Sequence, residues 1–129
     1  MMLKSGADTG WICDFYQYIT DEEVRLAFAL LIGRLACVKG VTLTRKAQGE
    51  VRSVGVYVDG QCWYTFMPAQ EWLTFQFRPP FTKLREDRKP DLQKDFLNKF
   101  TDEAQKGHWS VRLTSLSDAR QLLSTICVD

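Results

Sequence analysis

The hydrophobic pattern of the chain is strongest between residues 54 and 77, where three short apolar stretches follow one another. The first two are separated by Asp59-Gly60, which supplies the two positive-φ positions of a type I′ turn. Because a two-residue turn sets the register, we predict a hairpin in which Val56 lies opposite Trp63. In this register both faces of the hairpin are apolar: one carries Tyr57, Cys62, Tyr64 and Phe66, and the other Val54, Val56, Val58, Trp63 and Met67.

Apolar positions at helical spacing lie on both sides of this region. Thr20 and Glu23 form a capping box, which predicts a helix from residue 20 to about residue 38, with Gly40 as its stop. We predict further short helices at 11–19 and 91–100, another helix start at Thr101, and a final helix over 116–127 capped by Ser115 or Ser117. The first and last long helices have enough apolar surface to cover one face of a sheet.

The remaining strand signals complete an antiparallel sheet. Residues 41–46 are rich in β-formers, and residues 108–114 alternate between apolar and polar positions. With strands at 52–58, 61–67 and 72–77, we predict one α+β domain spanning 1–129. Its antiparallel sheet has about five strands, and an N-terminal and a C-terminal helix pack on one face. Three prolines predict a long charged loop over 78–90, and residues 1–10 are expected to be loose.

Composition narrows the class of protein. An apolar fraction of 45% is that of a folded globule, and no apolar run reaches the roughly 20 residues of a membrane span. The first residues lack a signal-peptide pattern, which predicts a cytoplasmic protein with no membrane contact. Four widely spaced cysteines, Cys13, Cys37, Cys62 and Cys127, are expected to be small buried hydrophobes.

The residues of catalytic sites are sparse. His108 is the only histidine, so a site built on several histidines is excluded. Gly-x-Gly-x-x-Gly, Gly-x-Ser-x-Gly and the Walker pattern are absent. Glu86 and Asp87 lie among basic residues, where mutual charge pairing explains them. We therefore expect a protein that is not an enzyme and needs neither a cofactor nor a metal.

Two groups of basic residues are candidates for contacts with a nucleic-acid backbone. One flanks the turn before the central hairpin and the other lies in the 78–90 loop: Arg45, Lys46 and Arg52, and Arg78, Lys83, Arg85, Arg88 and Lys89. A solvated surface also explains them, because acids are interspersed and the net charge is +1. Four aromatic residues are candidates for the wall of a small-molecule pocket, with core packing as the alternative: Tyr57, Trp63, Tyr64 and Trp72.

Self-association follows from the two apolar faces of the predicted hairpin. The long helices cover one face, so either the segments 11–19 and 91–100 or a second copy must cover the other. We expect a homodimer with a two-fold interface.

Four stretches spread over residues 20–126 form a pattern in this order: TDEEVRLAFALLIGRL, VGVYVDGQCWYTFMP, WLTFQFR and GHWSVRLTSLSDARQLLSTI. Together they resemble small bacterial α+β domains of the YdhG and YjbR-like type. His108-Trp109 and Asp118 with Leu122 and Leu123 match that pattern, whereas the Ser-Tyr ending is replaced by residues 127–129. The resemblance implies a compact sheet with helices on one face and, for some members, a DNA-binding role. We expect a non-enzymatic binding or assembly module that contacts nucleic acid through its basic loops; the alternative is a small-molecule-binding domain with an aromatic pocket.

Overall fold

The computed structural model describes residues 10–45 and 52–126 of the 129 residues. Within these residues the helices are α1 (Gly10–Tyr18), α2 (Glu22–Ala36), α3 (Pro79–Leu84), α4 (Lys89–Asp95) and α5 (Leu116–Thr125), with single 3-10 turns η1 (Glu86–Arg88) and η2 (Ala104–Lys106). The strands are β1 (Val41–Arg45), β2 (Val54–Val58), β3 (Gln61–Pro68), β4 (Leu73–Phe77), β5 (Phe100–Glu103) and β6 (His108–Leu113).

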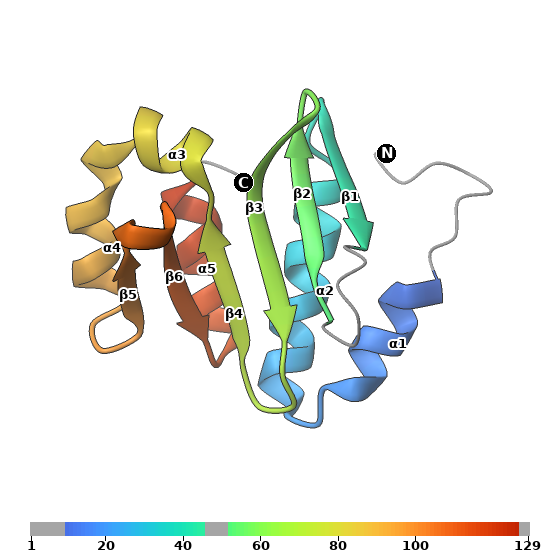
Figure 1. Cartoon of the computed structure of the whole chain (residues 1–129). Helices are drawn as coiled ribbons and strands as arrows, with labels where there is room; N and C mark the ends of the chain where they lie inside the picture. The colour runs from blue at the N-terminus through green and yellow to red at the C-terminus, as the bar shows by residue number, and fades with distance from the viewer. Residues whose placement is uncertain (1–9, 46–51, 127–129) are drawn as a thin grey trace.

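The strands form one antiparallel sheet in the order β1-β2-β3-β4-β6-β5, with α2 and α5 behind it in Figure 1. This arrangement confirms the predicted α+β class and the packing of an N-terminal and a C-terminal helix on one face. The sheet has six strands, because Thr101 lies in β5 opposite Ser110. The predicted helix start at Thr101 is therefore wrong: its Thr-Asp-Glu pattern is capping-like, but pairing with β6 satisfies this backbone instead.

The central hairpin contains a β-bulge. Asp59 and Gly60 have φ angles of 51° and 86°, which confirms the positive-φ turn. Tyr57 lies opposite Cys62, but Val56 lies opposite Tyr64, so Trp63 is an extra residue in β3. The predicted pairing of Val56 with Trp63 is wrong for this reason.

The bulge gives the sheet one apolar face. Beyond it, Tyr64 and Phe66 share the face of Val56 and Val54, and this face packs against the helices. Its buried side chains are Val41, Leu43, Val54, Val56, Tyr64, Phe66, Leu73, Phe75, Phe77, Trp109, Val111 and Leu113. The prediction of two apolar hairpin faces is therefore wrong, and the homodimer loses the argument that led to it.

The opposite face of the sheet is mainly polar. By the same alternation it carries Thr42, Thr44, Tyr57, Cys62, Thr65, Met67, Thr74, Gln76, Thr101, Glu103, His108, Ser110 and Arg112. The segments predicted to cover it lie elsewhere, because α1 contacts α2 and α4 contacts α5. A polar face of this kind is normal for an antiparallel sheet with one solvated side.

The start of α2 shows how local signals position the helical layer. The Asp21 carboxylate accepts a hydrogen bond from the Val24 N–H at 3.1 Å, so the cap is Asp21 and the predicted Thr20 cap is wrong by one residue. The Thr20 N–H instead donates to the Gln70 carbonyl at 2.9 Å, which joins the α1–α2 connection to the β3–β4 turn. The predicted short helix at 11–19 is confirmed as α1.

The predicted loop over 78–90 is wrong, because α3, η1 and the start of α4 occupy it. Pro79 and Pro80 lie in the first turn of α3, where a helix needs no backbone N–H donor. Phe81 is buried, with its ring centroid 5.0 Å from that of Phe77. A proline-rich, charged sequence is thus compatible with two short helices anchored by single aromatic or apolar side chains.

The cysteines that the structure describes are not buried as predicted. Cys13 and Cys37 are exposed and Cys62 is half-buried, all with free thiols, while Cys127 lies outside the described residues. Cys13 lies on the side of α1 away from the buried Trp11 and Phe15, and Cys37 follows the last residue of α2, so both stay accessible. Among the described residues, no helix has both the length and the apolar character needed to cross a membrane.

Candidate functional site

The structure separates the two groups of basic residues. Arg45 ends β1 and Arg52 precedes β2, at one end of the sheet. Arg78 follows β4 and lies at the opposite end, because β1 and β4 run in opposite directions (Figure 1). Lys46 lies outside the described residues. The two groups therefore do not join into one basic surface within the described chain.

Most of the second group is paired with acidic side chains. Arg85 contacts Asp87 at 3.2 Å, Arg88 contacts Asp91 at 3.8 Å, and Lys89 pairs with Asp102. The hydrogen bond from Arg85 lowers the pKa of Asp87, so this carboxylate stays charged beside the guanidinium. Of this group, Lys83 on α3 is exposed. The acids offset the positive charge that a phosphate would meet.

The first group of basic residues stacks on rings of α1. The Arg52 guanidinium carbon lies 3.5 Å from the centroid of the Tyr18 ring, and that of Arg45 lies 5.7 Å from the Phe15 ring. Such cation–π contacts hold α1 against the open end of β1 and β2. They explain these two arginines without a polyanionic ligand.

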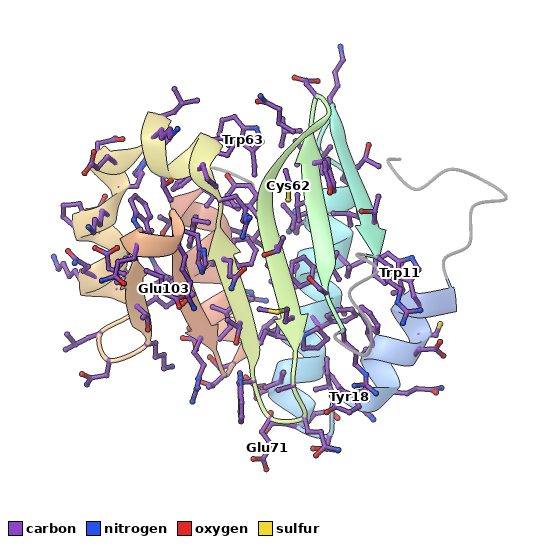
Figure 2. The ribbon with its side chains drawn as sticks, in the orientation of Figure 1. Trp11, Tyr18, Cys62, Trp63, Glu71 and Glu103 are labelled. Atoms are coloured by element: carbon purple, nitrogen blue, oxygen red, sulfur yellow. The ribbon has the colours of Figure 1, made fainter. Side chains whose placement is uncertain are left out.

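The four aromatic residues predicted to wall a pocket do not come together. Tyr64 is only 7% exposed and packs in the core, whereas Tyr57 lies on the opposite face of the sheet. Figure 2 shows Trp63 at the end of β3 near α3 and Glu71, the neighbour of Trp72, at the other end. The Trp72 ring instead stacks with Arg112, whose guanidinium carbon is 4.5 Å from its centroid.

A buried histidine and a carboxylate meet on the polar face of the sheet. Glu103 Oε2 lies 3.0 Å from His108 Nε2 and accepts a hydrogen bond from the Ser110 hydroxyl at 3.1 Å. A carboxylate can orient an imidazole for general base catalysis. Here, however, Nδ1 of His108 is enclosed with no hydrogen-bond partner among the described residues, and Ser110 binds the carboxylate rather than the imidazole. The cluster joins the edge strand β5 to β6.

Side chains that bind metal ions are not grouped in the described residues. In the part of the chain that the structure describes, no group of three or more His, Cys, Asp or Glu side chains could hold a metal ion. The polar face also carries hydroxyl and amide groups, such as Thr65, whose Oγ1 lies 2.9 Å from Gln76 Oε1.

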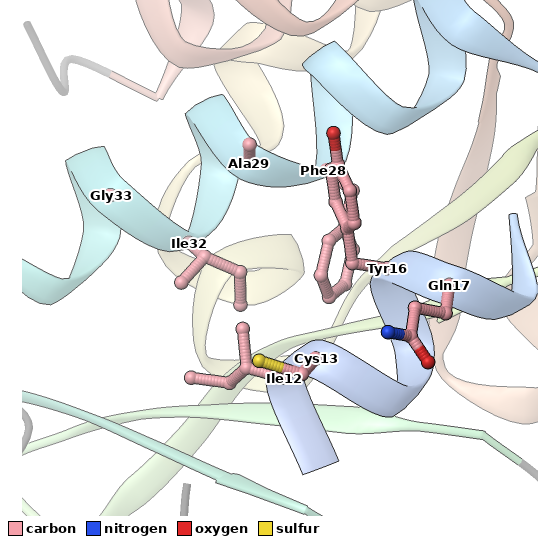
Figure 3. A pocket seen from close by; sticks show the side chains of 8 residues that line it. All are labelled: Ile12, Cys13, Tyr16, Gln17, Phe28, Ala29, Ile32 and Gly33. Atoms are coloured by element: carbon pink, nitrogen blue, oxygen red, sulfur yellow. The ribbon is translucent and has the colours of Figure 1, made fainter. Parts of the chain in front are cut away.

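An apolar groove of about 320 Å³ lies between α1 and α2 (Figure 3). Trp11 and Phe15 bury one side of α1, which leaves Ile12 and Tyr16 on the side toward the groove. Figure 3 shows Ile12 and Ile32 pointing toward each other across it. The lining contains no charged side chain: it consists of Ile12, Cys13, Tyr16, Gln17, Phe28, Ala29, Ile32 and Gly33.

The groove continues onto an apolar outer side of α2. The eight residues from Leu26 to Gly33 are all apolar, whereas a helix on a sheet needs apolar residues only on its inward side. The inward set is buried: Val24, Ala27, Phe28, Leu31, Ile32 and Leu35. On the outward side Leu26, at 39% exposure, Ala29 and Gly33 are exposed, and Leu30 is half-buried against the edge of the core. A Cβ built at Gly33 would meet no atom within 4 Å, so the stripe has a gap there.

The neighbouring helix α5 lacks such a stripe. It packs on the same face of the sheet, and its exposed positions are polar: Ser117, Arg120, Gln121 and Ser124. The difference between α5 and α2 shows that an apolar outer surface is a property of α2 rather than of the helical layer. None of the described residues predicted for a basic or an aromatic site lies on this surface. The available signal was the uninterrupted apolar run from Leu26 to Gly33, which is too wide for a helix apolar on one side only.

We find no family model, curated protein or solved structure that matches this chain. The resemblance to YdhG and YjbR-like domains therefore stays a prediction.

Proposed function

We propose that this protein is a non-enzymatic assembly module that binds an apolar helix of a protein partner. The binding surface is the outer side of α2 together with the groove beside it, here called the α2 surface: Ile12, Tyr16, Leu26, Ala29, Leu30 and Gly33. The observation that carries the proposal is the accessible apolar stripe on α2. Accessible apolar patches of this kind mark protein interaction sites.

The spacing of the stripe fits a helix as the bound element. Leu26, Ala29, Leu30 and Gly33 stand at i, i+3, i+4 and i+7, which is the ridge that one helix presents to another. Ala29 and Gly33 lack large side chains, so the backbone of a partner helix can approach closely. The groove along α1 then accepts side chains from the partner.

The charges at the ends of α2 select the direction of the partner helix. Glu22 and Glu23 lie in its first turn and Arg34 in its last turn. Within residues 10–45 and 52–126 no ion pair engages Glu22 or Arg34. A partner helix of the same charge order therefore fits in the antiparallel direction, where its basic end meets Glu22 and its acidic end meets Arg34.

The competing functions have less support. Phosphate contact requires accessible basic groups on one surface, and here the two groups lie at opposite ends of the sheet. An aromatic pocket requires Tyr57 and Tyr64 on one side of the sheet, and they face opposite sides. The buried His108 pair holds two strands together and offers no accessible base.

Binding of a defined probe tests the proposal. The probe is a fluorescein-labelled amphipathic helical peptide with leucines at i, i+3, i+4 and i+7, and a scrambled peptide of the same composition is the control. We expect fluorescence anisotropy to show binding of the first peptide only, weakened at least tenfold by Leu26→Glu and unchanged by Ser117→Glu on the exposed side of α5.

A parallel titration with random-sequence duplex DNA covers the alternative. DNA binding that falls steeply with salt, in the absence of peptide binding, would replace the proposal with a nucleic-acid function. Peptide binding that survives Leu26→Glu would place the binding surface elsewhere. Absence of binding by either peptide at 100 µM or so would overturn the proposal, since helix-in-groove sites bind well below that concentration.

A further inference from the structure

We infer that the helix received by the α2 surface is α2 of a second copy of this chain, related by a two-fold axis. The inference rests on the proposed function and specifies its partner. The two α2 helices pack antiparallel and cross between Ala29 and Leu30. Two features of this chain's own sequence identify the partner: Leu26 fits the open space at Gly33, and the charge of Glu22 complements that of Arg34.

The first part of the fit is a side chain and a gap. Leu26 projects from α2, while Gly33 two turns later leaves an open space where another residue would carry a side chain. When antiparallel helices cross between Ala29 and Leu30, Leu26 lies opposite the partner's Gly33. The two-fold axis repeats this contact, so each Leu26 enters a gap and each gap is filled. Filling a gap in this way is the knob-into-hole packing of helix pairs.

The open space at Gly33 is continuous with the groove between α1 and α2. Gly33 and Ala29 line the groove from the side of α2, and Ile12 and Cys13 line it from the side of α1. A leucine side chain entering beside Gly33 contacts apolar atoms of both helices. A glycine in the interior of a helix costs about 1 kcal/mol relative to alanine, so its presence here is explained by the close approach of another chain.

The second part of the fit is electrostatic. In the same crossing Glu22 faces the partner's Cys37, three residues and about one helical turn from the partner's Arg34, and the two-fold axis repeats this contact. Arg34 faces the partner's Arg25, but the Arg25 guanidinium is turned toward α1, where it lies 5.2 Å from the centroid of the Tyr16 ring. Glu22 and Arg34 are both exposed in the single chain. The antiparallel direction also opposes the two helix dipoles. A parallel pair would bring the two Glu22 side chains together and the two Arg34 side chains together.

The size of the interface sets its strength. A helix pair flanked by Tyr16 and Leu30 buries on the order of 1,000 Å², at the lower limit for specific interfaces. We therefore expect a dimer that dissociates in the micromolar range. A two-fold contact uses the same surface of both copies, so it closes at two chains and does not propagate. The polar outer side of α5 bounds this surface on one side.

Sedimentation equilibrium between about 1 and 200 µM provides the first test. We expect the mass to rise with concentration from the 14.9 kDa of one chain toward twice that value. Leu26→Glu should abolish the rise, and Gly33→Leu should weaken association at least tenfold by filling the gap. Ser117→Glu, a new charge on α5, should leave the dissociation constant within twofold. Circular dichroism melts of each variant at low concentration confirm that the fold is kept.

Charge reversal provides a test that does not depend on loss of binding alone. Glu22→Arg and Arg34→Glu should each weaken self-association, because each places like charges at both ends of the interface. An equimolar mixture of the two variants should regain association as a heterodimer, in which both ends again pair opposite charges. A mixture that stays monomeric while the parent dimerises would overturn the antiparallel arrangement.

The outcomes separate this inference from the proposed function. A parent chain that stays monomeric at 200 µM but binds the amphipathic peptide through Leu26 overturns the second copy as partner and leaves the α2 surface as a site for another protein. A monomeric chain that binds no peptide overturns both. A dimer that survives Leu26→Glu and Gly33→Leu overturns the inference, because its interface lies elsewhere.

Discussion

The Lys99 ammonium group donates a hydrogen bond of 2.8 Å to Asp118 Oδ2, and this ion pair joins the start of β5 to the first turn of α5. The same carboxylate oxygen accepts hydrogen bonds from the Thr114 N–H at 2.9 Å and from its hydroxyl at 3.2 Å. One carboxylate thus connects the residue before β5, the β6–α5 connection and the first turn of α5. The stability of this region depends on its charge.

Removal of the carboxylate should destabilise the fold. We expect Asp118→Ala to lower the free energy of unfolding by about 1 to 2 kcal/mol, because three donors lose their acceptor and α5 loses an acid from its first turn. Urea denaturation at pH 7 measures this difference. Asp91→Ala, which removes an exposed contact of 3.8 Å and also an acid from the first turn of α4, is the control and should change the value by only about 0.5 kcal/mol. Equal effects of the two substitutions would show that the Asp118 network adds no stability.

The contribution of Asp118 should depend on pH. Burial of the carboxyl raises its pKa, but the hydrogen bonds from Lys99 and Thr114 outweigh burial, so the pKa lies below the ordinary value of 3.8. The unfolded chain therefore takes up a proton at a higher pH than the folded chain does. The stabilisation is present above about pH 4 and is lost as pH falls through the folded pKa. We expect the difference between the parent and Asp118→Ala to be constant from pH 7 to 5 and to shrink below pH 4. A difference that persists undiminished at pH 2.5 would contradict this assignment.

Two glycines should respond in opposite directions to the same substitution. Gly60 has a φ of +86°, so Gly60→Ala should cost about 1 kcal/mol even though the space around it is open. Gly33 lies in the interior of α2 with open space around it, so Gly33→Ala should stabilise the single chain by about 1 kcal/mol. Thermal melts at 1 µM or so, below the expected dissociation constant, make the comparison. Coinciding melts of Gly60→Ala and the parent would contradict the turn geometry.

Two lysines of the predicted basic loop should differ in their effect on stability. Lys89 pairs with Asp102 across α4 and β5, and its ammonium nitrogen lies 5.8 Å from the centroid of the Trp109 ring. Lys83 on α3 is exposed. We expect Lys89→Ala to lower the free energy of unfolding by about 1 kcal/mol and Lys83→Ala to change it by only a few tenths. If the two variants unfold at the same urea concentration, the contact with Trp109 contributes nothing.

Short-range patterns predicted the elements whose geometry depends on a few neighbouring residues. The Asp59-Gly60 turn, the Ser115 cap of α5 and the alternation of Trp109 and Ser110 in β6 are all found in the structure. Each depends on backbone dihedral angles or hydrogen bonds within about four residues, and the types of neighbouring residues determine these. The buried side of α2 could be predicted in the same way, from helical spacing.

The extra residue Trp63 could not be predicted from the turn, because a two-residue turn sets the pairing of the residues next to it but not of residues farther along the strands. A bulge moves every later side chain of the strand to the opposite face. Tyr64 therefore entered the core, and the sheet lost its second apolar face. The same reason applies to the residues predicted for a pocket or a basic surface, because a local pattern does not show which strand ends lie side by side.

The candidate site depends on the same distinction. The sequence determined by itself that α2 is apolar from Leu26 to Gly33, because that is a matter of composition. Only the tertiary structure decided that Phe28 and Ile32 are buried in the core and that Leu26 and Gly33 remain accessible. The sheet and α1 can cover only part of the circumference of a helix. Which part stays accessible depends on where residues distant in the chain pack against it.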